Sequence, residues 1–324
     1  MPTTSAKKLR FYDLEPRADT FHDDVIQGLK LAQKRIPPKH FYDERGSRLF
    51  DAICATQEYY PTRTEMAILE DNCEDICKLL GPDCVLVEPG SGSSQKVRLI
   101  LDRLEPHTYM PLDISSEHLK TTASGLASEY PDINITAACI DYTQQITLPD
   151  YPDGRRSVAF FPGSSIGNFE HEDAVKFLRN LATLVKPRGG LLIGVDLKKK
   201  SSILNAAYND RDNITAQFNL NLLTRINTEL KADFKLDRFE HLAFYNEKQG
   251  RIEIYLVSTC NQLVTVAGHR FKFSEGESIH TENSYKYTIN EFQSLALKAG
   301  FTLQKTWTDA ARLFSVQYYD IAQL

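Results

Sequence analysis

The chain has 324 residues, 42% of them hydrophobic, which is enough for one large domain or two of ordinary size. Its net charge of -5 argues against the basic surface of nucleic-acid enzymes, so we expect no nucleic-acid partner. The 6 cysteines form no Cys-x-x-Cys pair, which predicts reduced thiols and no metal site. No apolar run resembles a signal peptide or a membrane span, so we expect a cytoplasmic protein without a membrane partner or an evident obligate protein partner.

Short apolar runs in the middle of the chain have the continuous character of buried parallel strands. They cover residues 85–88, 109–112, 133–139, 157–161 and 191–195. Helical stretches at residues 95–104, 116–129 and 172–184 separate them. This alternation predicts βαβ units and a doubly wound parallel sheet with helices on both faces.

The alternation stops after residue 200. A long helical stretch at 213–230 is followed by strand-like segments at 251–258 and 265–273. A helix at 289–299, ending at Gly300, and β-rich runs at 302–308 and 314–319 then complete a seven-stranded sheet. We therefore interpret residues 201–285 as an insertion that packs with the N-terminal helical region, residues 21–60, as a lid.

A glycine-containing loop, VEPGSGSS at residues 87–94, follows the first of these strands and opens a helix. Gly90 and Gly92 would let a ligand approach the backbone at the carboxyl edge of the sheet. Gln95 stands where a dinucleotide-binding fingerprint has its third glycine, which disfavours an NAD enzyme. Taken alone, the pair of glycines is equally consistent with an ordinary tight turn.

Two aspartates give the loop a chemical context. Asp113 ends the second strand, where a carboxylate can accept both hydroxyls of a ribose. Asp141 ends the third strand, at the position where S-adenosylmethionine (SAM)-dependent methyltransferases have a hydrogen-bond acceptor for the adenine amino group. Each alone could be a turn residue, but together with the loop they favour SAM as the cofactor.

Three further motifs identify a family: FYDERGS at residues 41–47, EYYPTRTE at 58–65 and GSSIGNF at 163–169. With them the chain resembles the histidine N-α-methyltransferases of ergothioneine biosynthesis, which trimethylate histidine to hercynine, over nearly its full length. The resemblance implies an α/β fold with a Rossmann-like, seven-stranded class I SAM methyltransferase sheet at residues 62–200 and 286–324. It also implies a substrate-binding domain formed by the N-terminal region and the late insertion, residues 1–61 and 201–285.

The resemblance implies the site residues by matching motifs. The cofactor contacts would be Tyr42, Gly90, Lys96, Asp113, Asp141 and Tyr142. The amino-acid substrate would contact Tyr59, Gly163, Asn168, Tyr208, Ile254, Glu282 and Ser284, with catalytic roles for Asn168 and Tyr42. Purely structural roles are also possible for these residues: Lys96 could be a solvated charge, Tyr59 a core aromatic and Asn168 a helix cap. Pro89 and Ile254 depart from the family pattern, the second beside the substrate ring.

Two alternatives remain. One is an N-methyltransferase for another amino acid, such as a tryptophan derivative, because fungal indole-alkaloid enzymes share the family. Glu282 discriminates here, since a carboxylate suits a ring with N–H donors and an indole would prefer a small apolar residue. The other is a non-catalytic SAM- or nucleotide-sensing module, which would have no use for an amino-acid site. A nucleic-acid or protein methyltransferase is disfavoured because FPGS at 161–164 replaces the D/N-P-P-Y/F motif.

Overall fold

A computed structural model describes residues 9–14, 19–92, 94–144, 147–148, 151–152, 154–185 and 187–322. The chain divides into two compact units. Unit 1 comprises Met1–Pro16, Arg63–Leu197 and Tyr287–Leu324, and unit 2 comprises Arg17–Thr62 and Lys198–Lys286. Ser93 of the predicted glycine loop lies outside the described residues. Within the described part of the chain, no helix is both long and apolar enough to cross a membrane.

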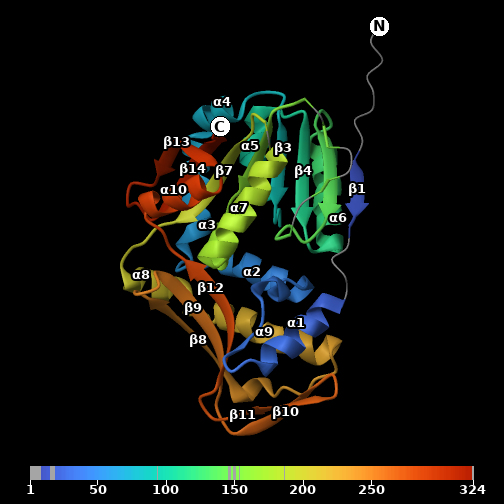
Figure 1. Ribbon diagram of the computed structural model, residues 1–324, viewed down its shortest axis with the longest axis vertical. Coiled ribbons are helices and arrows are strands. Elements are labelled where there is room, and N and C mark those ends of the chain that lie inside the picture. Colours follow the sequence, from blue (N-terminus) through green and yellow to red (C-terminus); the bar gives the residue numbers. More distant parts are fainter. Residues whose placement is uncertain are drawn as a thin grey trace. The chain divides into compact units, whose positions relative to one another are not determined.

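Unit 1 contains a mixed eight-stranded sheet (Figure 1). Its strands are β1 (Arg10–Asp13), β3 (Val85–Pro89), β4 (Thr108–Asp113), β5 (Asn134–Cys139), β6 (Ser157–Phe161), β7 (Gly190–Asp196), β13 (Phe301–Thr308) and β14 (Phe314–Ile321). They lie in the order β1-β5-β4-β3-β6-β7-β14-β13, and β14 runs antiparallel to both of its neighbours. The other neighbouring pairs are parallel, so the carboxyl ends of β3, β4, β5 and β6 share one edge.

The predicted count of seven strands was wrong by one, because β1 adds an eighth strand parallel to β5. The seven predicted strands are all present. Residues 10–13 therefore belong to the sheet of unit 1, whereas the predicted boundaries put residues 1–61 in the second domain. β1 escaped prediction because it has only four residues, with exposed ends and no continuous apolar run.

Helices cover both faces of this sheet. They are α3 (Tyr60–Asp71), most of which belongs to unit 1, α4 (Cys73–Leu80), α5 (Gln95–Leu104), α6 (Ser116–Glu129), α7 (His171–Val185) and α10 (Ile289–Lys298). Side chains alternate along β6: Phe160 joins a buried cluster with residues of α4, α5 and α6, whereas Phe161 packs on Phe177 of α7 at 4.8 Å between ring centroids. α10 packs beside α7, as Figure 1 shows. Burial on both faces explains why these strands read as continuous apolar runs.

Unit 2 combines helices from both of its chain segments with two small sheets. Its helices are α1 (Asp19–Lys30), η1 (Pro38–Phe41), α2 (Glu44–Ala55), α8 (Ser201–Ala207), α9 (Ile214–Glu229) and η3 (Leu236–Arg238). The strands β2 (Lys34–Arg35), β12 (Ser278–Tyr285), β9 (Arg251–Ser258) and β8 (Phe239–Asn246) form a four-stranded sheet in this order. α9 packs against α2 and against β8 and β9, so the two segments share one core.

One predicted strand of the insertion, residues 265–273, is a hairpin. β10 (Gln262–Val266) and β11 (His269–Phe273) pair antiparallel across the turn Ala267-Gly268. Both turn residues have positive φ, 47° and 82°, as a tight two-residue hairpin turn requires. Alanine rarely adopts this conformation, so the pair Ala267-Gly268 did not stand out as a hairpin turn.

Candidate functional site

The glycine loop leaves β3 in a conformation that needs glycine. Gly90 has φ of 69° and donates its N–H to the Leu112 carbonyl at 2.7 Å. A Cβ atom on Gly90 would lie 2.9 Å from the phenolic oxygen of Tyr142. Gly92, with φ of 49°, donates its N–H to Asp113 Oδ2 at 3.1 Å. Gly90 thus allows a close approach of the loop to Tyr142 that a larger residue would obstruct, and the positive φ of Gly92 favours glycine there.

Asp113 stands at the end of β4 and is oriented by the backbone. Oδ2 accepts from Gly92, and Oδ1 accepts from the N–H of Ser115 at 2.9 Å. An ionised carboxylate has about four lone-pair sites, so these two bonds leave capacity for a pair of hydroxyls. The side chain is half-buried, so it is both fixed and accessible.

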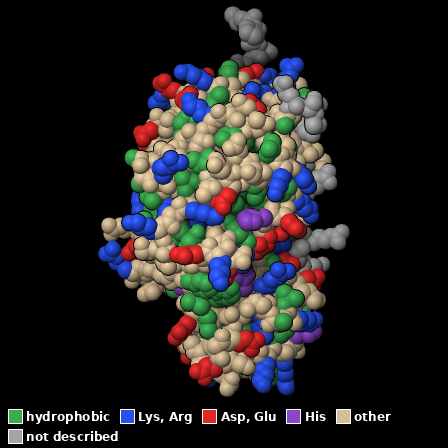
Figure 2. Space-filling model, turned by 60° about the vertical axis from the view of Figure 1, so that its left-hand side comes forward, with side chains coloured by type: hydrophobic (Ala, Val, Ile, Leu, Met, Phe, Trp, Pro, Cys, Tyr) green, Lys and Arg blue, Asp and Glu red, His purple; other side chains and the backbone are tan. Residues whose placement is uncertain are grey.

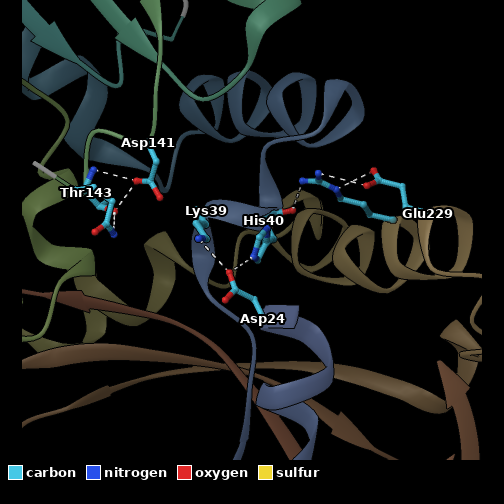
Figure 3. Close-up of polar contacts among 8 residues, drawn as sticks. Asp24, Lys39, His40, Asp141, Thr143 and Glu229 are labelled. Atoms are coloured by element: carbon cyan, nitrogen blue, oxygen red, sulfur yellow. Dashed lines mark hydrogen bonds and ion pairs between the residues drawn. The ribbon is translucent and has the colours of Figure 1, made fainter. Parts of the chain in front are cut away.

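Asp141 and Tyr142 follow β5 at the same edge. Asp141 Oδ1 accepts from the N–H of Thr143 at 3.0 Å and from its hydroxyl at 2.5 Å (Figure 3). The Tyr142 ring packs on Phe161 at 6.3 Å. Burial, and then the charges of Asp113 and Asp141, raise the pKa of Tyr142. The structure thus brings together four of the predicted cofactor residues: Gly90, Asp113, Asp141 and Tyr142.

Lys96, in the first turn of α5, is engaged in an ion pair and is not simply solvated. Its Nζ lies 2.5 Å from Glu65 Oε2, and the Glu65 side chain is only 1% exposed. Both Glu65 oxygens also accept from the N–H of Gly163, at 3.0 and 2.8 Å. Glu65 belongs to the EYYPTRTE motif, but sequence reasoning gave it no role. Gly194, a glycine inside the apolar strand β7, could have indicated that another group packs closely against that strand. A Cβ at Gly194 would lie 1.8 Å from Glu65 Oε1.

A second buried acid, Glu88 of β3, was also missed. It is 2% exposed and accepts a hydrogen bond from the hydroxyl of Tyr109. Burial raises the pKa of Glu88 to about 8, although the Tyr109 hydrogen bond and the Lys96 charge act in the opposite direction. Burial thus favours the neutral form of Glu88, which adds no charge next to the glycine loop.

The GSSIGNF motif forms the turn after β6 and the short helix η2 (Ser165–Asn168). Gly163 and Ser164 both have positive φ, 84° and 56°, and the Ser164 hydroxyl accepts from the N–H of Asp196 at 2.9 Å. Asn168 ends η2 and is half-buried. Its amide makes no hydrogen bond with any residue that the structure describes, so its donors and acceptor are available to a ligand.

In unit 2 the FYDERGS motif fixes the start of α2. Asp43 caps the helix by accepting from the N–H of Gly46 at 2.7 Å, and Asn221 of α9 donates to the same oxygen at 2.8 Å. A Cβ on Gly46 would lie 1.8 Å from the Phe41 carbonyl, which explains the glycine. Tyr42 is thereby held between η1 and α2, with its ring 5.8 Å from that of Phe218.

A polar cluster anchors η1 immediately before Tyr42. His40 Nε2 and Lys39 Nζ lie 2.9 and 3.0 Å from Asp24 Oδ2 of α1, as Figure 3 shows. Arg225 of α9 donates to the His40 carbonyl at 2.9 Å and pairs with Glu229 at 2.9 Å. Burial lowers the pKa of His40 to about 4, so the imidazole is neutral at physiological pH. The cluster ties α1 and α9 to η1, a structural role.

Five of the predicted substrate residues also lie in unit 2. The Tyr59 and Tyr208 rings are 6.1 Å apart, edge to face, and the Tyr208 hydroxyl donates to Ser284 Oγ at 2.8 Å. Ile254 of β9 stands opposite Glu282 of β12 in the strand register. Burial raises the pKa of Tyr59 well above its usual value, with further contributions from the neighbouring Tyr208, Cys54, Tyr42 and Glu282.

Lys286, directly after β12, was missed by sequence reasoning. It is 2% exposed, and its Nζ donates to Tyr208 Oη at 2.9 Å and to Ser284 Oγ at 2.8 Å. Glu282, Ser284 and Lys286 alternate along one stretch of chain and share a face. Burial raises the pKa of Glu282 to about 7, and the Lys286 charge opposes this rise. In the sequence, the alternation of Glu282, Ser284 and Lys286 could have indicated that Lys286 shares a face with the two predicted substrate residues.

The predicted cofactor and substrate sets do not follow the division into units. Tyr42 belongs to unit 2, whereas the other predicted cofactor residues belong to unit 1. Gly163 and Asn168 belong to unit 1, whereas the other predicted substrate residues belong to unit 2. The ligand contacts of all these residues remain predictions.

Basic and acidic side chains are interspersed over the face seen in Figure 2.

Comparison with known proteins bears on what these sites do. A family described as "Histidine-specific methyltransferase, SAM-dependent" matches residues 21–321. The chain is 40% identical to the histidine N-alpha-methyltransferase of Mycolicibacterium smegmatis, over 92% of this chain and 94% of that protein. It is 38% identical to the Mycobacterium tuberculosis enzyme of the same name, over 90% and 92%. Ergothioneine biosynthesis protein 1 of Schizosaccharomyces pombe is 30% identical over 87% of this chain and 38% of that longer protein.

The family match spans most of both units and includes all three of the motifs discussed above. The chain therefore belongs to the family of SAM-dependent, histidine-specific methyltransferases.

Proposed function

We propose that this chain transfers three methyl groups from SAM to the α-amino group of L-histidine and forms hercynine, the first step of ergothioneine biosynthesis. The observation that carries the choice of substrate is the polar row in unit 2. Glu282 and Ser284 share one face of β12, and the aromatic rings of Tyr59 and Tyr208 lie beside them. Such a row is suited to a side chain that is both aromatic and polar.

The residues of unit 1 fit the cofactor. Gly90 and Gly92 allow close approach, Asp113 has acceptor capacity for ribose hydroxyls, and Asp141 ends the next strand along the sheet edge. This is the edge of an open α/β sheet where nucleotide-like ligands bind. The strand order β5-β4-β3-β6-β7-β14-β13 corresponds to the class I methyltransferase sheet. SAM would supply a methyl group on a sulfonium, ready for in-line displacement.

The protein's main task is to position a neutral amine for this displacement. Effective molarity from such positioning can lower a barrier by roughly 7 to 11 kcal/mol. We assign this task to Asn168, whose amide oxygen can accept from the amine while its NH₂ donates to the substrate carboxylate. Burial and the sulfonium charge both favour loss of the ammonium proton before transfer.

The tyrosines of unit 2 suit the product. Each transfer leaves a cationic nitrogen, which must lose a proton before the next transfer, and the last transfer leaves a quaternary ammonium whose charge is permanent. Ring faces of Tyr42, Tyr59 and Tyr208 can stabilise this charge by about 0.5 to 2 kcal/mol each. This would favour repeated methylation over early release.

The imidazole would be read by hydrogen bonds. A neutral imidazole carries one N–H donor and one acceptor nitrogen, and a carboxylate with a hydroxyl satisfies both. A phenyl or aliphatic side chain would give no hydrogen-bond partner to the Glu282 carboxyl or to the hydroxyl proton of the buried Ser284. Sites of this kind reject analogues that lack the polar atoms by factors of about 10⁴ in favourable cases.

The test is a competition assay. The protein is incubated with SAM and equal concentrations of histidine, tryptophan and phenylalanine, and methylated products are identified by mass. We expect trimethylated histidine to dominate, and much of this preference to disappear in Glu282→Ala. Glu240→Ala, an exposed glutamate on β8, is the matched control and should behave like the wild type.

Two results would contradict the proposal. Comparable turnover of phenylalanine by the wild type would remove the reading of imidazole. Preference for tryptophan or a prenylated tryptophan would favour the second candidate, an indole amino-acid N-methyltransferase. The second candidate is supported by Ile254, which lies opposite Glu282 and departs from the family pattern beside the substrate ring.

A further inference from the structure

Three polar groups in unit 2 form a closed triangle. Lys286 Nζ lies 2.9 Å from Tyr208 Oη and 2.8 Å from Ser284 Oγ, and these two oxygens are 2.8 Å apart. The ammonium also lies 4.9 Å from the centroid of the Tyr208 ring. All three residues are buried, with exposures of 2%, 7% and 4% for Lys286, Tyr208 and Ser284. The side chains are therefore held in one geometry by one another.

The protons in this triangle can be counted. An ammonium has three donors and no acceptor, so both oxygens must accept from Lys286. The Tyr208 hydroxyl donates to Ser284 Oγ, as expected since a phenol is more acidic than an aliphatic alcohol. Ser284 Oγ then accepts two hydrogen bonds, which fills both of its lone pairs. Its remaining capacity is its own proton, which must point out of the triangle.

We propose that Lys286 is a positioning residue that fixes the direction of these hydrogen bonds, so that Ser284 offers the substrate side chain a donor and no acceptor. This inference rests on the proposed function, because it takes Ser284 to face the substrate ring. The carboxyl of Glu282, on the same face of β12, offers the opposite polarity when it is ionised. The ring selected is one that has an acceptor nitrogen for Ser284 and an N–H for Glu282.

Lys286 also affects Glu282. Burial raises the pKa of the Glu282 carboxyl, and the positive charge of Lys286 lowers it. A single buried cation thus stabilises the acceptor at Glu282 and enforces the donor at Ser284. With a neutral residue at position 286, the serine hydroxyl regains a free lone pair and can rotate. It could then accept from a ring N–H as readily as donate, and the site would lose its polarity.

The experiment compares three substrates in the wild type and in Lys286→Met. Histidine has both ring functions. β-(thiazol-4-yl)alanine has an acceptor nitrogen without N–H, and β-(pyrrol-3-yl)alanine has an N–H at the other nitrogen position without an acceptor. We expect kcat/KM for histidine and for the thiazole to fall about tenfold in Lys286→Met, as for loss of one oriented hydrogen bond in a buried site. The value for the pyrrole should fall clearly less, because this ring does not use the Ser284 proton and is affected only through Glu282.

Further variants separate positioning from general damage. Lys286→Gln, which keeps an NH₂ donor, should recover part of the loss. Adding Ser284→Ala to Lys286→Met should cost little more, whereas Ser284→Ala alone should reproduce the Lys286→Met pattern. Lys272→Met, an exposed lysine on β11, is the matched control. An equal fall for all three substrates, or additive effects of the two substitutions, would overturn the proposal.

Failure of the proposed function would look different. If the wild type methylates no histidine, the function is wrong whatever the variants do. Binding of the three amino acids in the presence of S-adenosylhomocysteine, measured by calorimetry, then still tests Lys286 by the same pattern. It also covers the case in which the pyrrole binds without turnover.

Discussion

Replacing Glu65 by glutamine tests the ion pair beneath the loops of unit 1. The carboxylate is 1% exposed, pairs with Lys96 at 2.5 Å and accepts twice from the Gly163 N–H. Glutamine keeps the shape and one acceptor for Gly163, but its NH₂ faces a cation. Removing one partner of a buried pair costs about 3 to 5 kcal/mol. Because the Lys96 side chain is 17% exposed, we expect the lower end, a loss of about 3 kcal/mol in the free energy of unfolding.

The assay is urea unfolding followed by tryptophan fluorescence. The single tryptophan, Trp307 in β13, belongs to unit 1 and donates to Asp75 at 2.8 Å, so its signal reports the unit that holds the pair. Lys96→Met and the variant that carries both substitutions complete a double-mutant cycle for positions 65 and 96. We expect the double variant to be little worse than either single one, which gives a coupling energy of about 2 kcal/mol or more.

The exposed residues Glu172 and Lys176 of α7 provide the matched control. Glu172→Gln and Lys176→Met should each change stability by no more than about 0.5 kcal/mol. If Glu65→Gln costs less than about 1 kcal/mol, or if the effects at positions 65 and 96 simply add, then the pair does not organise this region and the reasoning fails.

Three further predictions concern the sites. Asp113→Ala should lose at least about 1.5 kcal/mol of SAM binding while remaining folded, and unchanged affinity by calorimetry would remove Asp113 from the site. Asn168→Ala should impair histidine turnover with SAM affinity nearly intact; the reverse pattern would contradict its assignment. Burial raises the pKa of Glu282 from its usual 4.5 to about 7, so the folded protein binds this proton more tightly than the unfolded chain. Relative to Glu282→Gln, wild-type unfolding free energy should therefore fall by about 1 to 3 kcal/mol between pH 4.5 and 7; parallel curves in urea titrations would disprove the shift.

Strands and helices with strong local signals were predicted well from the sequence. β6 and α6 have the predicted bounds, because a buried strand is continuously apolar and a helix has its own period. β8 was not predicted, since its exposed positions Leu242 and Phe244 break the expected alternation of polar and apolar residues. β1 depends on pairing with β5, more than a hundred residues later in the chain, which no local pattern reveals.

The residues missed at the sites share a physical cause. Glu65 is tied to Gly163 across 98 positions, and Lys286 to Tyr208 across 78. A buried charge is tolerated only because the tertiary fold supplies partners for it. The sequence around Glu65 therefore does not indicate its role, and around Lys286 only the alternation of polar residues does. The glycines and aspartates of the cofactor loop were easier, because they follow strands whose carboxyl ends must meet at one edge.

The two-segment construction of unit 2 has a consequence for protein synthesis and for engineering. On the ribosome, α2 emerges long before α9, its packing partner, so the first segment must wait for residues 198–286 with its apolar face uncovered. A chain stopped at residue 197 would leave that face without a partner. For the same reason unit 2 cannot be moved to another methyltransferase as a single cassette: a transplant needs both segments, joined at separate points.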